Sequence, residues 1–230
     1  MTRWPEPFIR NRGSLTHEQQ LILQESHVAV IGCGGLGGYV IEELVRIGIG
    51  RLMVYDPDNF SLSNCNRQLG ATLGTIGKNK AEIAARDGLN IHGRCSIIPM
   101  AMDFRDGHEG VPDTVQVLVD CLDDIQARRD LAALSNNRKI PLVHGAVNGW
   151  YGQVGVQPAG GDLISRLFQR QDGRARNKTP IPELSFTVAT VAGLQAAETV
   201  KLLLGLDSQL HNNWMSVDLL HCEFEVVIKP

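Results

Sequence analysis

The chain lacks the features that mark secreted, membrane-bound and nucleic-acid-binding proteins. Its five cysteines stand apart, with no Cys-x-x-Cys pair among 230 residues. That pattern argues against a disulfide framework or a zinc site and for reduced thiols. A signal-peptide pattern is also missing, and the net charge of −3 gives no field that would attract nucleic acid or a membrane surface. We therefore expect a cytoplasmic protein without nucleic-acid or membrane partners.

Long uninterrupted apolar runs and linkers are missing too. The longest apolar stretch, residues 186–206, is broken by Gln195, Glu198 and Lys201, so it predicts a buried helix and not a membrane span. No Pro/Ser-rich segment divides the chain. Because 43% of the residues are hydrophobic, the chain can bury one large core, and we expect a single domain over residues 1–230.

The order of apolar runs and helical patterns predicts the fold class, α/β. Strand-like runs alternate with helical patterns from residue 27 to about residue 146, and further strand-like runs follow at 150–157, 214–220 and 222–228. This order predicts a doubly wound, Rossmann-like, mostly parallel sheet with antiparallel strands toward the C-terminal end. Residues 158–183 are predicted to form a long crossover loop rich in basic residues, and loops of that length are usually functional or disordered.

A Gly-rich turn follows the first apolar run of the chain. Gly32, Gly34 and Gly37 have the spacing G-x-G-x-x-G and lead directly into a helical pattern. The first glycine permits a tight turn, the second lets the backbone approach a phosphate, and the third lets the helix pack close to the strand. Asp56 ends the second apolar run, at the spacing from which an acid reaches a ribose hydroxyl. The turn, with Gly35, predicts a nucleotide site but does not choose between NAD and ATP.

The residues after Asp56 favour ATP. A dehydrogenase has no need for amides and cations clustered directly behind the acid that binds ribose. A nucleotidyl transfer does, because such donors hold a triphosphate and stabilise charge on the α-phosphate. These donors are Asn64, Asn66, Arg67 and Lys80. An NAD-dependent oxidoreductase is the alternative from another enzyme class.

Asn64, Asn66 and Arg67 stand, with Asp58 and Ser63 as further candidates for the nucleotide site, in a segment that resembles a known family. The ATP-binding segment of the ThiF/MoeB/HesA adenylyltransferases, relatives of ubiquitin-activating enzymes, is similar to the run Asp56-x-Asp58-x-x-Ser-x-Ser63-Asn64-x-Asn66-Arg67-Gln68. The likeness covers nearly the whole chain and continues in residues 192–198 and in Asp120-Cys121-Leu122-Asp123-Asp124.

The resemblance implies an ATP- and Mg²⁺-dependent adenylation of a carboxylate. Its substrate would be the C-terminal glycine of a ubiquitin-like sulfur-carrier protein, and its products an acyl-adenylate and pyrophosphate. Within the family, a tRNA threonylcarbamoyladenosine dehydratase-like enzyme is the alternative, and the basic loop keeps it open. The non-enzymatic alternative is a nucleotide-binding scaffold that docks a ubiquitin-like partner without turnover.

The same resemblance assigns catalytic roles to Arg10, Arg67, Lys80 and Asp123. Arg67 and Lys80 match the family's phosphate-contacting Arg and Lys, and Lys78 is the competing assignment for Lys80. Arginine can bind a phosphate through two parallel hydrogen bonds, whereas lysine acts as a point charge.

Asp123 matches the family's aspartate that serves Mg²⁺ and the nucleotide phosphates. Mg²⁺ usually takes only one or two carboxylates from a protein. The alternative is that Asp123 caps the helix that begins near Ile125. Asp124 also matches the nucleotide site, but the family usually has Asn there, so Asp124 adds a negative charge beside ATP.

An N-terminal arginine implies a homodimer. The family motif Tyr-x-Arg-Asn-x-Gly, whose Arg reaches the γ-phosphate of the partner subunit, resembles Phe8-Ile-Arg10-Asn11-x-Gly13. The match selects Arg10 over Arg12 as the residue that completes the neighbouring site. A frayed basic terminus without such a role is the alternative.

The remaining chemistry-bearing residues are assigned structural roles. Cys33 and Cys121 lie at apolar strand ends, as small packing residues do, and His144 on a predicted buried strand is expected to be a core histidine. The family's zinc-binding and thioester-forming cysteines flank or lie in its crossover loop, and residues 158–186 contain no cysteine. The resemblance is therefore to a zinc-free member.

Overall fold

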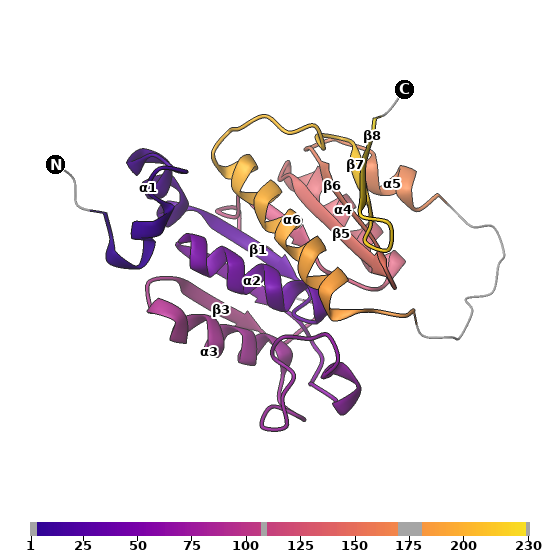
Figure 1. The fold of residues 1–230 in the computed structure, drawn as a ribbon, viewed down its shortest axis with the longest axis horizontal. Helices are drawn as coiled ribbons and strands as arrows, with labels where there is room; N and C mark the ends of the chain where they lie inside the picture. The colour runs from indigo at the N-terminus through magenta and orange to yellow at the C-terminus, as the bar shows by residue number, and fades with distance from the viewer. Residues whose placement is uncertain (1–3, 107–109, 170–180, 229–230) are drawn as a thin grey trace.

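The computed structural model describes residues 4–106, 110–169 and 181–228 (Figure 1). Its helical elements are η1 (Glu6–Asn11), α1 (His17–Glu25), α2 (Gly35–Ile47), η2 (Leu62–Asn64), α3 (Lys80–His92), α4 (Ile125–Arg138), α5 (Leu163–Leu167) and α6 (Ser185–Leu203). Its strands are β1 (His27–Ile31), β2 (Arg51–Tyr55), β3 (Ser96–Met100), β4 (Val117–Asp120), β5 (Leu142–Asn148), β6 (Tyr151–Gln157), β7 (Trp214–Asp218) and β8 (Glu223–Val227).

The strands form one sheet in the order β3-β2-β1-β4-β5-β6-β7-β8. Pairing is parallel from β3 through β5 and antiparallel from β5 to β8. The predicted fold class, a doubly wound and mostly parallel sheet with antiparallel strands toward the C-terminal end, is confirmed. The chain winds outward from β1 to β3 and then returns to β4. In such sheets ligands bind beyond the carboxyl ends of the strands at this switch point.

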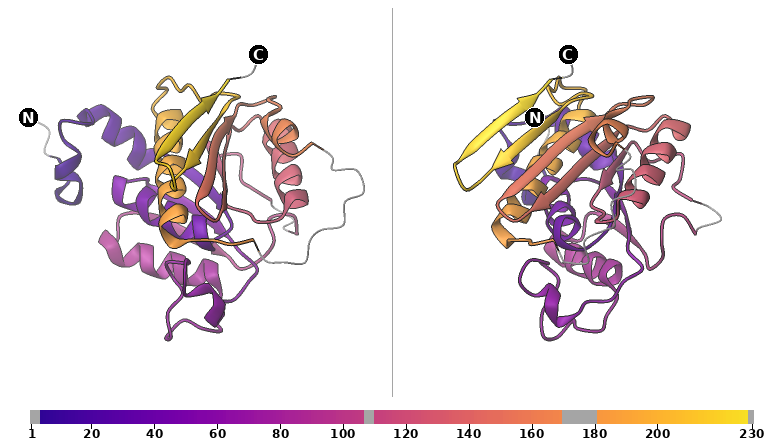
Figure 2. Two further views of the ribbon diagram at one scale, coloured as in Figure 1. Left: turned by 45° about the vertical axis from the view of Figure 1, so that its right-hand side comes forward. Right: turned by 90° about the vertical axis from the view of Figure 1, so that its right-hand side faces the viewer.

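Helices cover both faces of the sheet (Figure 2). Val28 and Val30 of β1 belong to the core under α2, α3 and α6. Ala29 and Ile31 belong to the core under α4 and α5. Because successive side chains of a strand point to opposite faces, a strand buried on both sides is a continuous apolar run. Among the described residues, no helix has the length and apolarity that crossing a bilayer requires.

The loop predicted over residues 158–183 contains a short helix, α5, so that part of the prediction is wrong. Leu163 and Ile164 are fully buried, and the Ile164 N–H donates to Gln157 Oε1 over 3.1 Å. A five-residue helix has too few internal hydrogen bonds to be stable alone, and packing against the sheet stabilises it here. Residues 170–180 of the predicted loop lie outside the described residues.

Candidate active site

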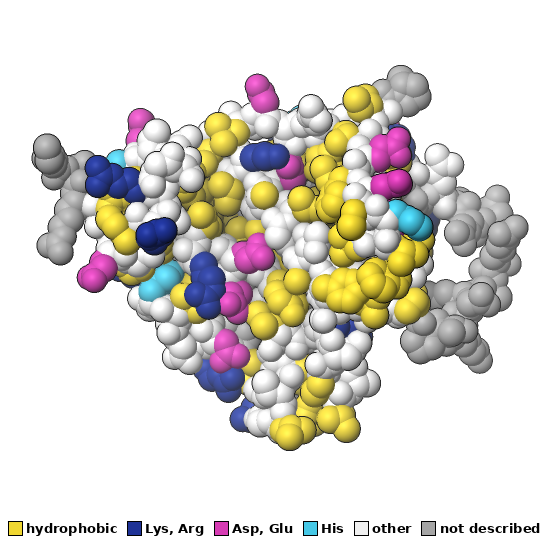
Figure 3. All heavy atoms as spheres, viewed as in Figure 1, with side chains coloured by type: hydrophobic (Ala, Val, Ile, Leu, Met, Phe, Trp, Pro, Cys, Tyr) yellow, Lys and Arg dark blue, Asp and Glu magenta, His cyan; other side chains and the backbone are white. Residues whose placement is uncertain are grey.

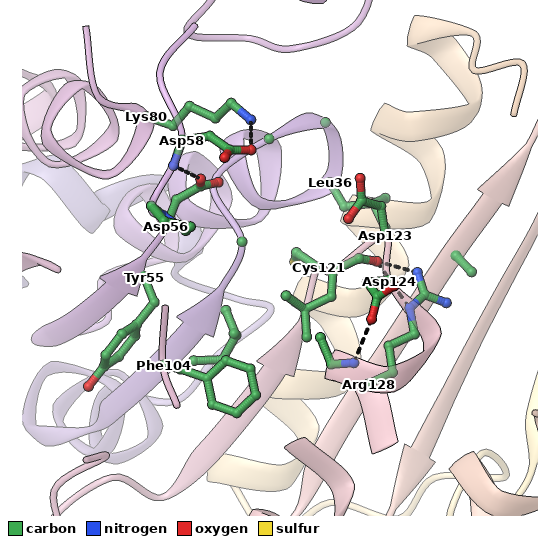
Figure 4. A pocket seen from close by; sticks show the side chains of 18 of the residues that line it. Leu36, Tyr55, Asp56, Asp58, Lys80, Phe104, Cys121, Asp123, Asp124 and Arg128 are labelled. Carbon is green, nitrogen blue, oxygen red and sulfur yellow. Dashed lines mark hydrogen bonds and ion pairs between the residues drawn. The ribbon is translucent and has the colours of Figure 1, made fainter. Parts of the chain in front are cut away.

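A cavity of about 430 Å³ opens at the carboxyl ends of β1, β2 and β4 (Figure 4). Its volume lies within the roughly 300–1,000 Å³ of small-molecule sites. Figure 4 shows charged side chains on two sides of the cavity. Asp58, after β2, and Lys80, at the start of α3, face the aspartates of the β4–α4 junction. The wall contains nine of the predicted residues, namely Gly32, Gly34, Gly35, Asp56, Asp58, Arg67, Lys80, Asp123 and Asp124.

The Gly-rich turn forms one end of this cavity. Gly32 has a φ of +96°, and a Cβ there would lie 2.6 Å from the Cys121 carbonyl oxygen. A Cβ at Gly37 would lie 1.8 Å from the Gly32 carbonyl oxygen, so a side chain at either position would displace backbone. This close packing brings the amino end of α2 to the cavity, where its N–H groups and dipole favour an anion.

Asp56 ties the turn to the end of β2. One carboxylate oxygen accepts the Cys33 N–H over 2.8 Å, and the other accepts the Asp58 N–H over 2.9 Å. Burial raises the pKa of the Asp56 carboxyl, and Lys80 and these two N–H donors oppose that rise. Asp56 is therefore rigidly placed at the position that the ribose acid takes in a nucleotide-binding turn.

Lys80 is the lysine in the cavity wall. It is the first residue of α3, and its ammonium lies 3.0 Å from the Asp58 carboxylate. Only 10% of the Lys80 side chain is exposed, against 68% for Asp58. The competing candidate, Lys78, is exposed and lies outside the wall. The geometry therefore favours Lys80 for contact with a ligand.

Arg67 is held by three neighbours. Its guanidinium donates to the Ser63 carbonyl oxygen over 3.0 Å and to Asn66 Oδ1 over 2.8 Å. It also forms an ion pair with the Glu183 carboxylate. Ser63, Asn64 and Asn66 were predicted to contact the cofactor, but none of them lines the cavity. Their observed contacts instead stabilise the turn before Arg67. Asn64 Oδ1, for example, accepts the Ser61 N–H over 2.9 Å.

At the β4–α4 junction, the N-cap of α4 and the exposed aspartate of the cavity wall are two different residues. The N-cap of α4 is Asp124, whose carboxylate accepts the Ala127 N–H over 2.9 Å. The alternative interpretation of Asp123 as the cap is therefore wrong by one residue. Asn and Asp are comparable N-caps, which accounts physically for an Asp where the resembled family usually has Asn. Asp123 is exposed and lines the cavity.

A buried polar network lies behind Asp123. Asp120 Oδ2 contacts His144 Nδ1 at 2.7 Å, and Gln153 Nε2 contacts His144 Nε2 at 3.1 Å. A carboxylate only accepts and an amide nitrogen only donates, so this geometry fits a neutral imidazole with its proton on Nδ1. Burial also lowers the pKa of His144, although Asp120 opposes that effect. His144 is thus a fully buried histidine with both ring nitrogens engaged, as its position on an apolar strand predicted.

Arg128 links this network to the junction and was not predicted. Its guanidinium donates to the Leu122 carbonyl oxygen and lies 3.9 Å from Asp120, while Asp120 Oδ1 accepts the Leu122 N–H over 3.0 Å. Burial alone raises the pKa of Asp120, but Arg128 and His144 outweigh it and leave that pKa below its usual range. Both polar groups of Leu122, the residue before Asp123, are thereby fixed.

Other cavity residues missed by the sequence, among them Asp103, Phe104 and Arg105, follow β3, and three more lie at the two ends of the crossover segment. Phe168, Ile181 and Glu183 line the cavity, and the Phe168 ring packs edge-on against His144 and under Arg128. Their only signal in the sequence was the length of the loop that contains them.

Arg10 lies away from this cavity. Asn11 Nδ2, beside it in η1, donates to the Ile47 carbonyl oxygen at the last turn of α2 over 3.2 Å. The cavity is at the other end of this 13-residue helix, roughly 20 Å away at 1.5 Å per residue. The chain therefore does not bring Arg10 or its neighbour Arg12 into its own site.

Two thiols lie near the site: Cys33 is buried, and the half-buried Cys121 lines the cavity. Burial raises the pKa of both Cys33 and Cys121 well above the usual range of a thiol. Neutral thiols are poor nucleophiles, so these two cysteines fit the structural role predicted for them. Within the described ranges, no three His, Cys, Asp or Glu side chains gather in a way that could hold a metal ion by themselves.

Comparison with known proteins gives consistent similarities. The profile of the ThiF family matches residues 9–229. The SAMP-activating enzyme E1 of Haloferax volcanii is 33% identical over 214 residues, which cover 91% of this chain and 79% of that protein. The molybdopterin-synthase adenylyltransferase of Escherichia coli is 31% identical over 209 residues, covering 89% and 84%.

Two further matches are partial or distant. A tRNA threonylcarbamoyladenosine dehydratase of Haemophilus influenzae is 33% identical over 123 residues, which span 53% of this chain and 47% of that protein. The crystal structure of E. coli MccB with MccA-N7isoASN superposes with a TM-score of 0.79 at 20% identity. The match covers 91% of this chain and 66% of MccB, and it shows a shared fold.

Proposed function

This chain belongs to the ThiF family, and we propose that it uses ATP to adenylate a carboxylate, the C-terminal glycine of a ubiquitin-like sulfur-carrier protein. One observation carries the proposal. The Gly-rich turn, Asp56, Arg67, Lys80 and Asp123 line a single cavity. An NAD enzyme requires the first two features but not the paired cations beside them. The relatives named as an adenylyltransferase and as an activating enzyme support the same chemistry.

The donor set of the cavity fits a magnesium–nucleotide complex. The amino end of α2, Arg67 and Lys80 offer positive charge to phosphates, and apolar side chains such as Phe104 and Leu122 line the wall where a base could pack. Asp123 offers a carboxylate to Mg²⁺, which takes only one or two from a protein when phosphates and water complete its shell, whereas the Asp124 carboxylate caps α4. Mg²⁺ would neutralise phosphate charge, with Asp123 as its protein ligand.

The chain's residues promote the reaction by positioning and by charge. A carboxylate oxygen of the carrier attacks the α-phosphorus of ATP, the bond between that phosphorus and the bridging oxygen breaks, and pyrophosphate leaves with the electron pair. Negative charge grows on the phosphates, where Arg67 and Lys80 stabilise it. Asp56 accepts a hydrogen bond from a ribose hydroxyl and so fixes the position of the nucleotide. No side-chain nucleophile takes part, so neutral thiols at Cys33 and Cys121 are compatible with the mechanism.

A homodimer with shared sites belongs to the proposal. Arg10 is far from its own cavity, so it can contribute only to the site of a second copy. Figure 3 shows hydrophobic side chains gathered over α6 and the β7–β8 hairpin, and Trp150, Phe186 and Phe224 are among the exposed large side chains. An apolar surface of this kind is typical of an interface between subunits. We place the second copy there.

Exchange of labelled pyrophosphate into ATP tests the proposed reaction. We expect exchange with a carrier that ends in Gly-Gly and none with the same carrier lacking those glycines. ATP turnover that requires tRNA instead would favour the dehydratase-like alternative, which the partial match supports. Calorimetric binding of NAD in preference to ATP would contradict adenylation, and ATP binding without exchange would leave a nucleotide-binding scaffold.

A further inference from the structure

Arg67, which the proposed function needs for the phosphates, is already paired with a carboxylate. Its guanidinium Nε contacts Glu183, a residue just before α6. Exposure is 23% for the Arg67 side chain and 24% for the Glu183 side chain. Both residues line the nucleotide cavity. The ion pair therefore lies in the wall of the site and is partly shielded from water.

The main chain around Glu183 holds its carboxylate at this place. Asn66 Nδ2 donates to the Glu183 carbonyl oxygen over 3.1 Å, and the Gly149 N–H donates to the Pro182 carbonyl oxygen over 2.7 Å. Gly149 and Glu183 also form an isolated β-bridge. None of these bonds uses the Glu183 carboxylate, so the side chain can leave Arg67 while the backbone stays docked.

Glu183 and a nucleotide phosphate compete for the same cation. Both are oxyanions that accept charge-assisted hydrogen bonds from a guanidinium. A phosphate that approaches Arg67 meets a like charge while Glu183 is bound, and partial burial weakens the screening by water. Asp58 pairs with Lys80 in a similar way, but its side chain is 68% exposed. Glu183 is the better shielded of the two counter-ions.

We propose that Glu183 is a further residue of the nucleotide site. Its carboxylate is the internal counter-ion of Arg67, and the phosphates of ATP displace it on binding. Glu183 thereby lowers the affinity for phosphorylated ligands and keeps Arg67 in place when no nucleotide is bound. This role rests on the proposed function, because it concerns the same ATP site.

Calorimetric titration of wild type and Glu183→Gln with ATP and with adenosine tests this role. Glutamine keeps the size of the side chain and removes its charge. A partly exposed ion pair is worth up to about 1 kcal/mol, so ATP should bind Glu183→Gln about two- to fivefold more tightly. Adenosine, which has no phosphate, should bind both proteins equally. Glu42→Gln, which breaks the surface pair with Arg46, is the matched control and should leave both affinities unchanged.

A second arm shows whether the gain passes through Arg67. In an Arg67→Ala background, Glu183→Gln should no longer tighten ATP binding. Equal or weaker ATP binding by Glu183→Gln, repeated with Glu183→Ala and with thermal melting to verify folding, would overturn the inference while leaving the proposed function intact. A gain that persists without Arg67, or that extends to adenosine, would also overturn it. Failure of wild type to bind ATP at all would refute the proposed function and this role together.

Discussion

Replacing Lys80 by Met should separate catalysis from stability. Methionine keeps most of the apolar stem of this largely buried side chain and removes its charge. The partner carboxylate, Asp58, is 68% exposed, so the lost ion pair is worth only about 0.2–1 kcal/mol of unfolding free energy. For a chain of this length, that corresponds to a melting-temperature shift of about 4 °C at most.

The effect on the reaction should be far larger. Removal of one preorganised donor that stabilises transition-state charge costs about 10²–10³ in rate, or roughly 2.7–4 kcal/mol. Pyrophosphate exchange and thermal melting of the same preparations measure the two effects. Lys78→Met is the matched control, because Lys78 is exposed and outside the cavity, and it should behave as wild type. Exchange by Lys80→Met at the rate of Lys78→Met would show that the phosphates bind elsewhere.

Four further outcomes are expected. Replacing all five cysteines by Ala should leave adenylate formation largely intact, and a thioester trapped on any of them would contradict this. Metal analysis of untagged protein should find no stoichiometric zinc; about one ion per chain would refute that expectation. The lowered pKa of His144 means that its stabilising effect is present above pH 6.5, the unfolded value, and declines as pH falls toward the folded value. His144→Asn should therefore lose less stability than wild type in melts between pH 7.5 and 5.5, and equal losses would contradict this. Mixing inactive Arg10→Ala with inactive Lys80→Met should partly restore activity, because one site of a mixed dimer carries neither lesion; no recovery after verified subunit exchange would refute shared sites.

Most of the fold could be predicted from the sequence because its signals are local. β1 and β2 are apolar runs buried on both faces, and the glycines of the turn are required by contacts within a few residues or with the adjacent strand end. The short helix α5 could not be predicted, because burial against the sheet stabilises it and its own sequence does not.

Some residues of the candidate site could be predicted from the sequence, and others could not. Asp56 was predicted from its spacing after the turn and Lys80 from the resemblance to the family, and both line the cavity. The pairing of Arg67 with Glu183 could not be found, since the contact that docks it, from Asn66 to Glu183, joins residues 117 positions apart. Arg128 was also missed, because its function depends on the carbonyl group of Leu122 and not on a motif of side chains. The N-cap of α4 is Asp124, and the sequence had offered Asp123, because sequence patterns place helix ends only to within a few residues.

The most direct test of the proposed chemistry follows an oxygen atom. A carrier peptide whose C-terminal carboxylate contains ¹⁸O is incubated with the protein and Mg·ATP, and hydroxylamine traps the activated acyl group. Attack of the carboxylate on the α-phosphorus transfers one carboxylate oxygen to the nucleotide. Mass spectrometry should therefore find AMP that contains one ¹⁸O atom, together with the acyl hydroxamate. Unlabelled AMP, or ADP with the label in inorganic phosphate, would contradict adenylation at this site.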